Sequence, residues 1–179
     1  MASESNHDIL FEPVKIGPKM APNRFFQVPH CNGAGSFRPG AQAAFRAMKA
    51  EGGWGTVCVE YCSISPESDD TPHCCVRMWD EGDVINLRHT ADSVHEHGAL
   101  AGIQLWYGGG HAPVRETLAI SRGPSQMPSE TAYQNYCHEC DEDDIRDLIE
   151  MYVTAAKMSE QAGFDYVEII GSDSALPTQ

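Results

Sequence analysis

The sequence predicts an α/β fold, the amino-terminal half of a TIM (β/α)8 barrel, and three observations lead to this prediction. Short apolar segments typical of buried strands alternate with amphipathic segments typical of helices. Each expected helix ends close to a glycine, and the next strand begins within a few residues. The alternation stops after a fourth strand, which would leave a buried-type strand edge unpaired. We therefore expect the 179-residue chain to be a fragment that contains the first four strands, with an open flavodoxin-like sheet as the alternative.

The first part of the chain predicts two core strands around one helix. Residues 9–17 alternate between apolar and polar side chains and predict a short strand or hairpin ahead of the core. Residues 25–28 form the first expected core strand. Residues 40–50 carry apolar side chains at helical spacing and run into two glycines. Residues 56–64 have the composition of a buried strand.

The second part predicts two more helix and strand pairs. A helix over 83–97, ended by Gly98, precedes a buried strand over 99–106. The irregular segment 112–140 is longer than most loops in compact domains, which favours a functional role. The acidic run 141–144 then opens a long helix, because carboxylates suit a helix amino terminus. That helix stops at a glycine, and 166–170 form the fourth strand.

The net charge, the apolar runs and the cysteine content indicate which binding partners and which cellular compartment to expect. A formal net charge of −14 disfavours binding to nucleic acid, because phosphates would be repelled. No apolar run is long enough to cross a membrane, and the amino terminus lacks an apolar signal segment. Seven cysteines, several of them within apolar runs, fit a reducing compartment better than a disulfide framework. We therefore expect a cytoplasmic protein.

The segment from Val28 to Gly35 predicts a ligand site. It delivers Val28, Pro29, His30 and Cys31 to the carboxyl end of the first core strand and then continues as a glycine-rich loop. Ligand sites in parallel α/β proteins collect at the carboxyl ends of the strands. Glycine allows the backbone to approach a ligand closely, and a thiol stands beside it here.

Several long segments then carry a resemblance to a known family. They are ILFEPVKIGP, NRFFQVPHCNGAG, KAEGGWG, EYCSISPESDD, WDEGD, HGALAGIQLWYGGGHAP and RGPSQMPSE. Together they resemble the trimethylamine dehydrogenase branch of the Old Yellow Enzyme flavoproteins, to which dimethylamine and histamine dehydrogenases also belong. The resemblance implies a barrel that binds FMN at the carboxyl ends of its strands. It also implies a 4Fe-4S cluster and a dinucleotide-binding domain in the part that is missing.

The resemblance assigns roles to individual residues. Cys31 matches the cysteine that forms the 6-S-cysteinyl link to FMN, and His30 matches a basic residue beside the flavin ring, with residues 28–30 offering backbone groups. Gln104 matches the glutamine that hydrogen-bonds the pyrimidine edge of the ring. Tyr61 matches an aromatic wall around the methylammonium group of the substrate, and Glu60 precedes it at the end of the second strand.

The end of the fourth strand departs from the family pattern. Ile170, Asp173 and Ala175 stand where trimethylamine dehydrogenase has a tyrosine, a histidine and a second tyrosine. We therefore expect Ile170 and Asp173 near the substrate. Asp173 is a candidate catalytic base or an anion that faces a cationic amine, or else a solvated loop residue.

These assignments predict an FMN-dependent oxidoreductase that oxidises a small alkylamine such as trimethylamine. Its electrons would leave through the cluster to an electron-transfer protein, and a homodimer is compatible with the sequence. One alternative is a reductase of the Old Yellow Enzyme type, which takes electrons from NAD(P)H and reduces an activated alkene. The other is a flavin-free binding or zinc protein that uses Cys137 and Cys140, although that pair lacks an obvious second pair of ligands.

Overall fold

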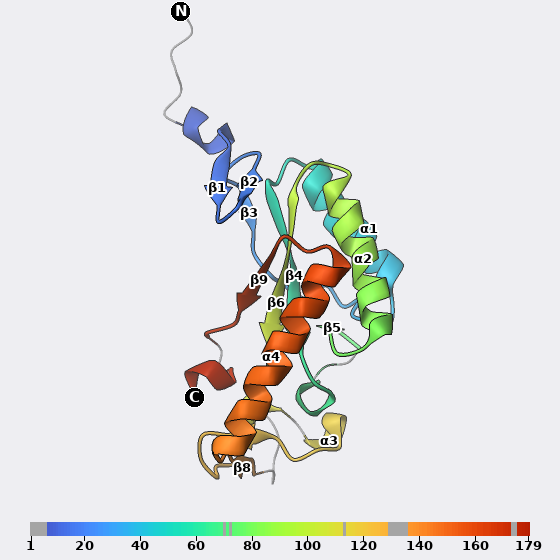
Figure 1. The fold of residues 1–179 in the computed structure, drawn as a ribbon. Helices are drawn as coiled ribbons and strands as arrows, with labels where there is room; N and C mark the ends of the chain where they lie inside the picture. The colour runs from blue at the N-terminus through green and yellow to red at the C-terminus, as the bar shows by residue number, and fades with distance from the viewer. Residues whose placement is uncertain (1–6, 70, 72, 113, 129–135, 173–174) are drawn as a thin grey trace, which may run out of the picture.

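The computed structural model describes residues 7–69, 71, 73–112, 114–128, 136–172 and 175–179. Its main sheet is parallel and follows the chain in order (Figure 1). The strands are β3 (Phe26–Gln27), β4 (Thr56–Ser63), β6 (Leu100–Trp106) and β9 (Tyr166–Ile169), and β5 (Val76–Arg77) pairs with the carboxyl end of β4. Each predicted core strand is therefore present, within one or two residues of its predicted ends.

The strand order confirms half of a barrel rather than an open sheet. Each core strand pairs with the next one along the chain, whereas a flavodoxin-like sheet places its first strand between the second and third. The connecting helices are α1 (Pro39–Glu51), α2 (Glu81–His95) and α4 (Glu142–Ala162). They pack side by side in chain order, α1 on α2 and α2 on α4 (Figure 1). The open-sheet alternative is therefore wrong.

The main hydrophobic core lies between the sheet and these helices. Val57, Ile103 and Leu105 supply buried side chains from the strands, and Val84 and Leu148 meet them from α2 and α4. The outward side chains of β9 are different, because Val167 and Ile169 are exposed at the open edge of the sheet.

The segment ahead of the core is only partly as predicted. Residues Asp8–Phe11 form a 3-10 turn, η1, instead of a strand, and the hairpin follows as β1 (Val14–Ile16) and β2 (Lys19–Ala21). Gly17 has a φ of +55° at its turn, a value that favours glycine. The Lys19 ammonium lies 2.9 Å from the Asp165 carboxylate, which joins the hairpin to the turn before β9.

Capping residues set the helix ends. Helix α2 begins earlier than the predicted residue 83, because Asp80 and Asp83 form a capping box at its amino terminus. The acidic run that opens α4 works in the same way, with Asp141 and Asp144 as the capping pair. Gly163 ends α4 with a φ of +100°, as the glycine stop predicted.

Short elements organise the long segments that follow β4 and β6. They are η2 (Pro66–Ser68), η3 (Gly109–His111), α3 (Val114–Thr117), β7 (Arg122–Gly123), β8 (His138–Glu139) and, after β9, η4 (Leu176–Thr178). Arg122 is nearly buried and pairs with Glu67 and, at 2.8 Å, with Asp147 of α4. These ion pairs fix the segment after β6 against both η2 and α4. Across the described parts of the chain, we find no helix with the length and apolarity to cross a bilayer.

Candidate functional site

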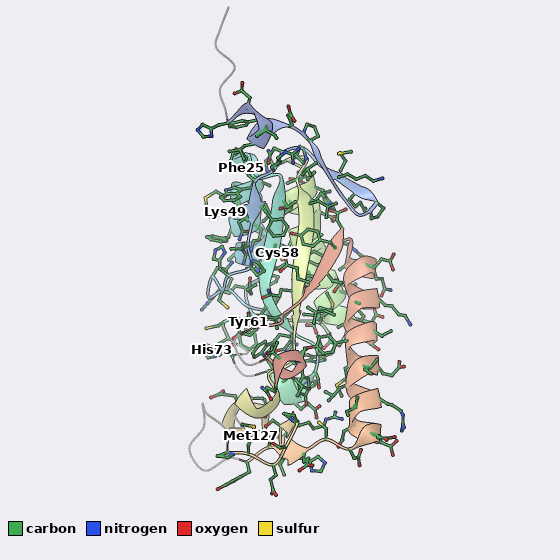
Figure 2. All side chains as sticks on the ribbon, turned by 90° about the vertical axis from the view of Figure 1, so that its left-hand side faces the viewer. Phe25, Lys49, Cys58, Tyr61, His73 and Met127 are labelled. Atoms are coloured by element: carbon green, nitrogen blue, oxygen red, sulfur yellow. The ribbon has the colours of Figure 1, made fainter. Side chains whose placement is uncertain are left out.

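The carboxyl ends of the parallel strands bring the predicted site residues to one rim of the sheet. In Figure 2 Cys58 lies midway along β4, and Tyr61 lies nearer the carboxyl end of that strand. Tyr61, Gln104 and Glu168 occupy one row across β4, β6 and β9, since Tyr61 pairs in register with Gln104 and Gln104 with Glu168. The Gln104 amide donates a hydrogen bond of 3.2 Å to the Glu168 carboxylate.

An irregularity in β4 creates this row. Between the pairs Cys58–Gly102 and Tyr61–Gln104, β4 advances by three residues while β6 advances by two. An extra residue of this kind changes the face that the following side chains occupy. Tyr61 is therefore in line with Gln104, and Glu60 beside it is completely buried.

An aromatic and apolar cluster lies beyond this row. The rings of Tyr61 and Trp106 have centroids 5.3 Å apart at an angle of 53°. Ile170 and Ala175 pack with Trp106, so two of the three positions that depart from the family pattern line the same cluster as Tyr61. The indole Nε1 of Trp106 is buried and has no hydrogen-bond partner among the described residues. Trp106, to which the sequence analysis assigned no role, belongs to this rim.

A chain of polar contacts connects Tyr61 to Cys31. The Tyr61 hydroxyl forms a hydrogen bond with the Thr71 hydroxyl, and Thr71 Oγ1 lies 3.1 Å from Cys75 Sγ. Cys75 Sγ in turn lies 3.3 Å from Cys31 Sγ. Cys31 is exposed and Cys75 is buried. The thiol and the aromatic wall that the sequence predicted therefore share one rim.

A buried ionic network holds the loop that carries Cys31. Arg46 of α1 and Glu60 of β4 are both 0% exposed, and the guanidinium lies 2.5 Å from the carboxylate. Arg46 also donates a 2.6 Å hydrogen bond to the backbone carbonyl of His30, and Gln42 donates one of 2.6 Å to Glu60. Because the His30 carbonyl adjoins Cys31, this network fixes the backbone just before the thiol.

The other predicted residues of the loop are accessible. Val28 is 63% exposed, His30 is exposed and Pro29 lies partly buried between them. The His30 ring approaches Gln27 Nε2 at 2.9 Å and packs against Phe45 of α1, with centroids 5.6 Å apart. The loop thus presents one apolar and one basic side chain beside the Cys31 thiol.

Glu168 is a site residue that the sequence analysis missed. Burial raises the pKa of its carboxyl above the ordinary value, although the hydrogen bonds from Gln104 and Cys58 oppose that shift. Its alternation with exposed Val167 and Ile169 along β9 is a signal that could have marked it as inward-facing. The approach of Cys75 to Cys31 left no such signal, since 44 residues separate them.

Asp173 lies outside the described residues. The Cys137 thiol donates to the Ser125 carbonyl at 3.1 Å, and Cys140 lines a pocket against α4. Within the described ranges, no three His, Cys, Asp or Glu side chains gather as metal ligands.

Comparison with known proteins finds amine-oxidising relatives. Dimethylamine dehydrogenase of Hyphomicrobium sp. (strain x) is 51% identical over 185 residues, which cover 100% of this chain and 25% of that protein. The structure of histamine dehydrogenase from Rhizobium sp. 4-9 superposes with a TM-score of 0.87 at 44% identity, over 92% of this chain and 26% of that one. A 6-hydroxypseudooxynicotine amine oxidase from Pseudomonas geniculata N1 gives 0.86 at 37% identity, over 90% and 24%.

The chain therefore spans about a quarter of the length of these relatives. An old yellow enzyme homologue from Zymomonas mobilis is more distant, with a TM-score of 0.82 and 26% identity over 93% of this chain and 49% of that one. The matched relatives confirm the resemblance to the amine dehydrogenase branch. The family described as NADH:flavin oxidoreductase / NADH oxidase matches residues 9–179. On this match, which covers nearly the whole chain, the protein belongs to the NADH:flavin oxidoreductase / NADH oxidase family.

Proposed function

We propose that residues 1–179 form the first half of an FMN-binding barrel, and that the whole protein is an FMN-dependent oxidoreductase of a small alkylamine. One observation carries this proposal: the Cys31 thiol and the Tyr61–Trp106 aromatic pair share a rim. The 51% identity to a dimethylamine dehydrogenase supports the substrate class.

The side chains at the rim fit a flavin ring. Val28 offers exposed apolar surface, and Gln104 offers an amide that can both donate and accept. Glu60 Oε1 is a buried acceptor, and Trp106 Nε1 a buried donor, and neither has a hydrogen-bond partner among the described residues. Buried polar atoms nearly always have a hydrogen-bond partner, so these two atoms without one favour the binding of a polar ligand at this rim.

We assign the cofactor contacts to residues of the chain's first three core strands. The backbone of Val28, Pro29 and His30 would lie along the ring, and Gln104 and Glu60 would meet its polar groups. The Cys31 thiol would supply the sulfur of a 6-S-cysteinyl thioether, with the thiol proton and the ring hydrogen leaving as two electrons pass to an acceptor such as dioxygen. Such a bond would keep the cofactor in place.

The substrate would lie against Tyr61 and Trp106. An aromatic face attracts a protonated or quaternary amine by about 0.5–2 kcal/mol per ring. Ile170 and Ala175 complete an apolar wall where the family pattern has tyrosines, so the alkyl groups of the amine would find no phenol there. FMN held by Cys31, Gln104 and Glu60 would supply a two-electron acceptor for the hydride equivalent on the carbon beside the amine nitrogen, and water would hydrolyse the imine product. Asp173 stays a sequence-based candidate for the base or for the anion that faces the amine.

The resemblance to the trimethylamine dehydrogenase branch implies further features of the whole protein. We expect the rest of the barrel, a 4Fe-4S cluster and a dinucleotide-binding domain in the longer protein. Electrons would then pass singly from the flavin to the cluster and on to an electron-transfer protein. A homodimer and a cytoplasmic location are further expectations.

Acid denaturation of the full-length protein tests the central claim. The yellow colour should stay with the precipitated polypeptide, and the Cys31→Ala variant should release it while the Cys74→Ala variant behaves like wild type. Wild-type protein that releases all its flavin would rule out the thioether. Bleaching of the flavin by dimethylamine or trimethylamine, without NADPH, tests the substrate class.

The same preparation separates the alternatives. Rapid bleaching by NADPH and none by amines would favour an ene-reductase, for which buried Ala175 provides no proton donor. A colourless protein loaded with zinc at Cys137 and Cys140 would favour the flavin-free alternative.

A further inference from the structure

We infer that Cys75 is the redox partner of Cys31: the two thiols close to a disulfide in the flavin-free protein, and reduction of that disulfide releases Cys31 for flavin attachment. The first half of this inference stands on the two cysteines alone. The second half rests on the proposed thioether at Cys31.

The geometry brings two distant loops into direct contact at the two sulfurs. Cys31 follows β3 and Cys75 precedes β5, yet their sulfurs lie 3.3 Å apart. A disulfide bond is about 2.05 Å long, so the sulfurs need to approach by only about 1 Å. Cys31 lies in an exposed loop, where a side-chain rotation can supply such a movement.

Gly35 allows the loops to approach this closely. Its φ is +52°, and a Cβ atom placed on it would lie 3.0 Å from the Cys75 carbonyl oxygen. Any other residue would be strained at this φ and would crowd the Cys75 backbone. Glycine at this position therefore permits the close approach of the two loops.

The two thiols differ in a way that assigns an order to the chemistry. Cys31 is exposed, whereas Cys75 is 1% exposed. The hydrogen bond with Cys31 and then burial raise the pKa of the Cys75 thiol well above its ordinary value. The thiolate is the attacking form of a cysteine in thiol–disulfide exchange, and the external disulfide that it attacks must have access to that sulfur. Cys31 is therefore the thiol that meets an oxidant first, and Cys75 is the thiol that resolves the product.

The exchange uses a low-molecular-weight disulfide such as oxidised glutathione. The Cys31 thiolate attacks one sulfur of that disulfide, which forms a mixed disulfide and expels one glutathione thiolate. The Cys75 thiol then gives up its proton to a thiolate and attacks Cys31 Sγ, which expels the second glutathione. The two protein thiols are oxidised by two electrons and one glutathione disulfide is reduced to two thiols.

The Cys31–Cys75 disulfide would protect the exposed Cys31 thiol from modification before the flavin is attached. A sulfur held in a disulfide has no thiolate with which to form a thioether, so flavin attachment must wait for reduction. Once the thioether has formed, Cys31 can no longer pair with Cys75, and the switch is closed permanently. Cys75 thus protects Cys31 only until the cofactor arrives.

Peptide mapping of full-length protein, purified flavin-free from a riboflavin-starved host and equilibrated with oxidised glutathione, tests the disulfide. Trypsin places Cys31 in peptide 25–46 and Cys75 in peptide 50–77. The two peptides should be linked in wild type and in Cys74→Ser, which controls for the neighbouring thiol. In Cys75→Ser the link should disappear and Cys31 should accumulate as the glutathione mixed disulfide. A link that survives Cys75→Ser, or wild-type protein that accumulates as much mixed disulfide as that variant, would overturn the inference.

A second measurement tests whether the Cys31–Cys75 disulfide blocks flavin attachment; we call this block the gate. FMN added to the oxidised wild-type protein should remain acid-extractable, and it should become acid-stable after the disulfide is reduced. Equal attachment before and after reduction would refute the gate. If even the reduced protein never holds flavin, the thioether proposal fails and the gate with it, while the peptide map still decides the disulfide by itself.

Discussion

Replacement of Arg46 by methionine should weaken the whole region behind the Cys31 loop. The Arg46 guanidinium is 0% exposed and lies 2.5 Å from the equally buried Glu60 carboxylate. It also donates to the His30 carbonyl at 2.6 Å and to Gln27 Oε1 at 3.2 Å. Methionine fills a similar volume but supplies no positive charge and no donor. The substitution therefore leaves the Glu60 carboxylate buried without its counter-charge.

The size of the effect follows from burial. Removal of one partner from a buried ion pair typically costs about 3–5 kcal/mol, because the remaining charge is uncompensated. An exposed pair contributes about 0–1 kcal/mol, since water screens it. Arg146 of α4 supplies the matched control: its guanidinium is 64% exposed and lies 2.8 Å from Glu142. We expect Arg46→Met to cost several times more free energy of unfolding than Arg146→Met.

Native-state hydrogen exchange of the full-length protein measures this locally. Peptides from α1 and β4 should lose about 10²–10⁴-fold of their protection in Arg46→Met, since every 1.4 kcal/mol corresponds to a factor of ten. The double variant Arg46→Met/Glu60→Leu should recover part of the loss, because both charges are then gone. The reasoning is refuted if Arg46→Met stays within tenfold of wild type, or if the second substitution deepens the loss.

Three further outcomes are expected. Tyr61→Leu should raise the Kd or KM for the amine by about 2- to 30-fold from the loss of one aromatic face, while Tyr61→Phe should change it little; equal effects of the two variants would contradict a cation–π role. Burial raises the pKa of the Glu168 carboxyl above its ordinary value of 4.5. The wild-type protein therefore loses stability as the pH rises from 4.5 through the folded-state pKa. In thermal unfolding, Glu168→Gln should be more stable than wild type at pH 7, and the two should not differ below pH 4.5. Burial opposes ionisation of Asp165, but hydrogen bonds from Lys19, His95 and a backbone N–H outweigh it and hold the pKa of Asp165 below 3.8. Asp165→Asn should therefore unfold at a lower temperature than wild type at pH 7, and the difference should shrink as the pH falls through the folded-state pKa; a difference that persists in acid would exclude this ionic contribution.

Local sequence predicted the elements of the fold because their signals are local. The glycine at 163, the acidic run at 141–144 and the apolar run at 99–106 each report on hydrogen bonds and burial within a few residues. Residues 9–17 predicted a short strand or hairpin, and the structure has a 3-10 turn at Asp8–Phe11 followed by the hairpin, since apolar alternation over so few residues fits both a strand and a turn. Site residues at strand ends were also predictable, because parallel strands deliver their carboxyl ends to one rim.

The contacts between distant segments were decided only by the tertiary structure. The extra residue in β4 puts Tyr61 in register with Gln104, and the local sequence of β4 does not predict this bulge. The approach of Cys75 to Cys31 and the burial of Arg46 against Glu60 depend on how α1 and two loops pack. The sequence by itself determined the strands, the helices and the family, because periodicity and motifs are properties of the chain. Which side chains touch depends on the packing of segments that lie far apart along it.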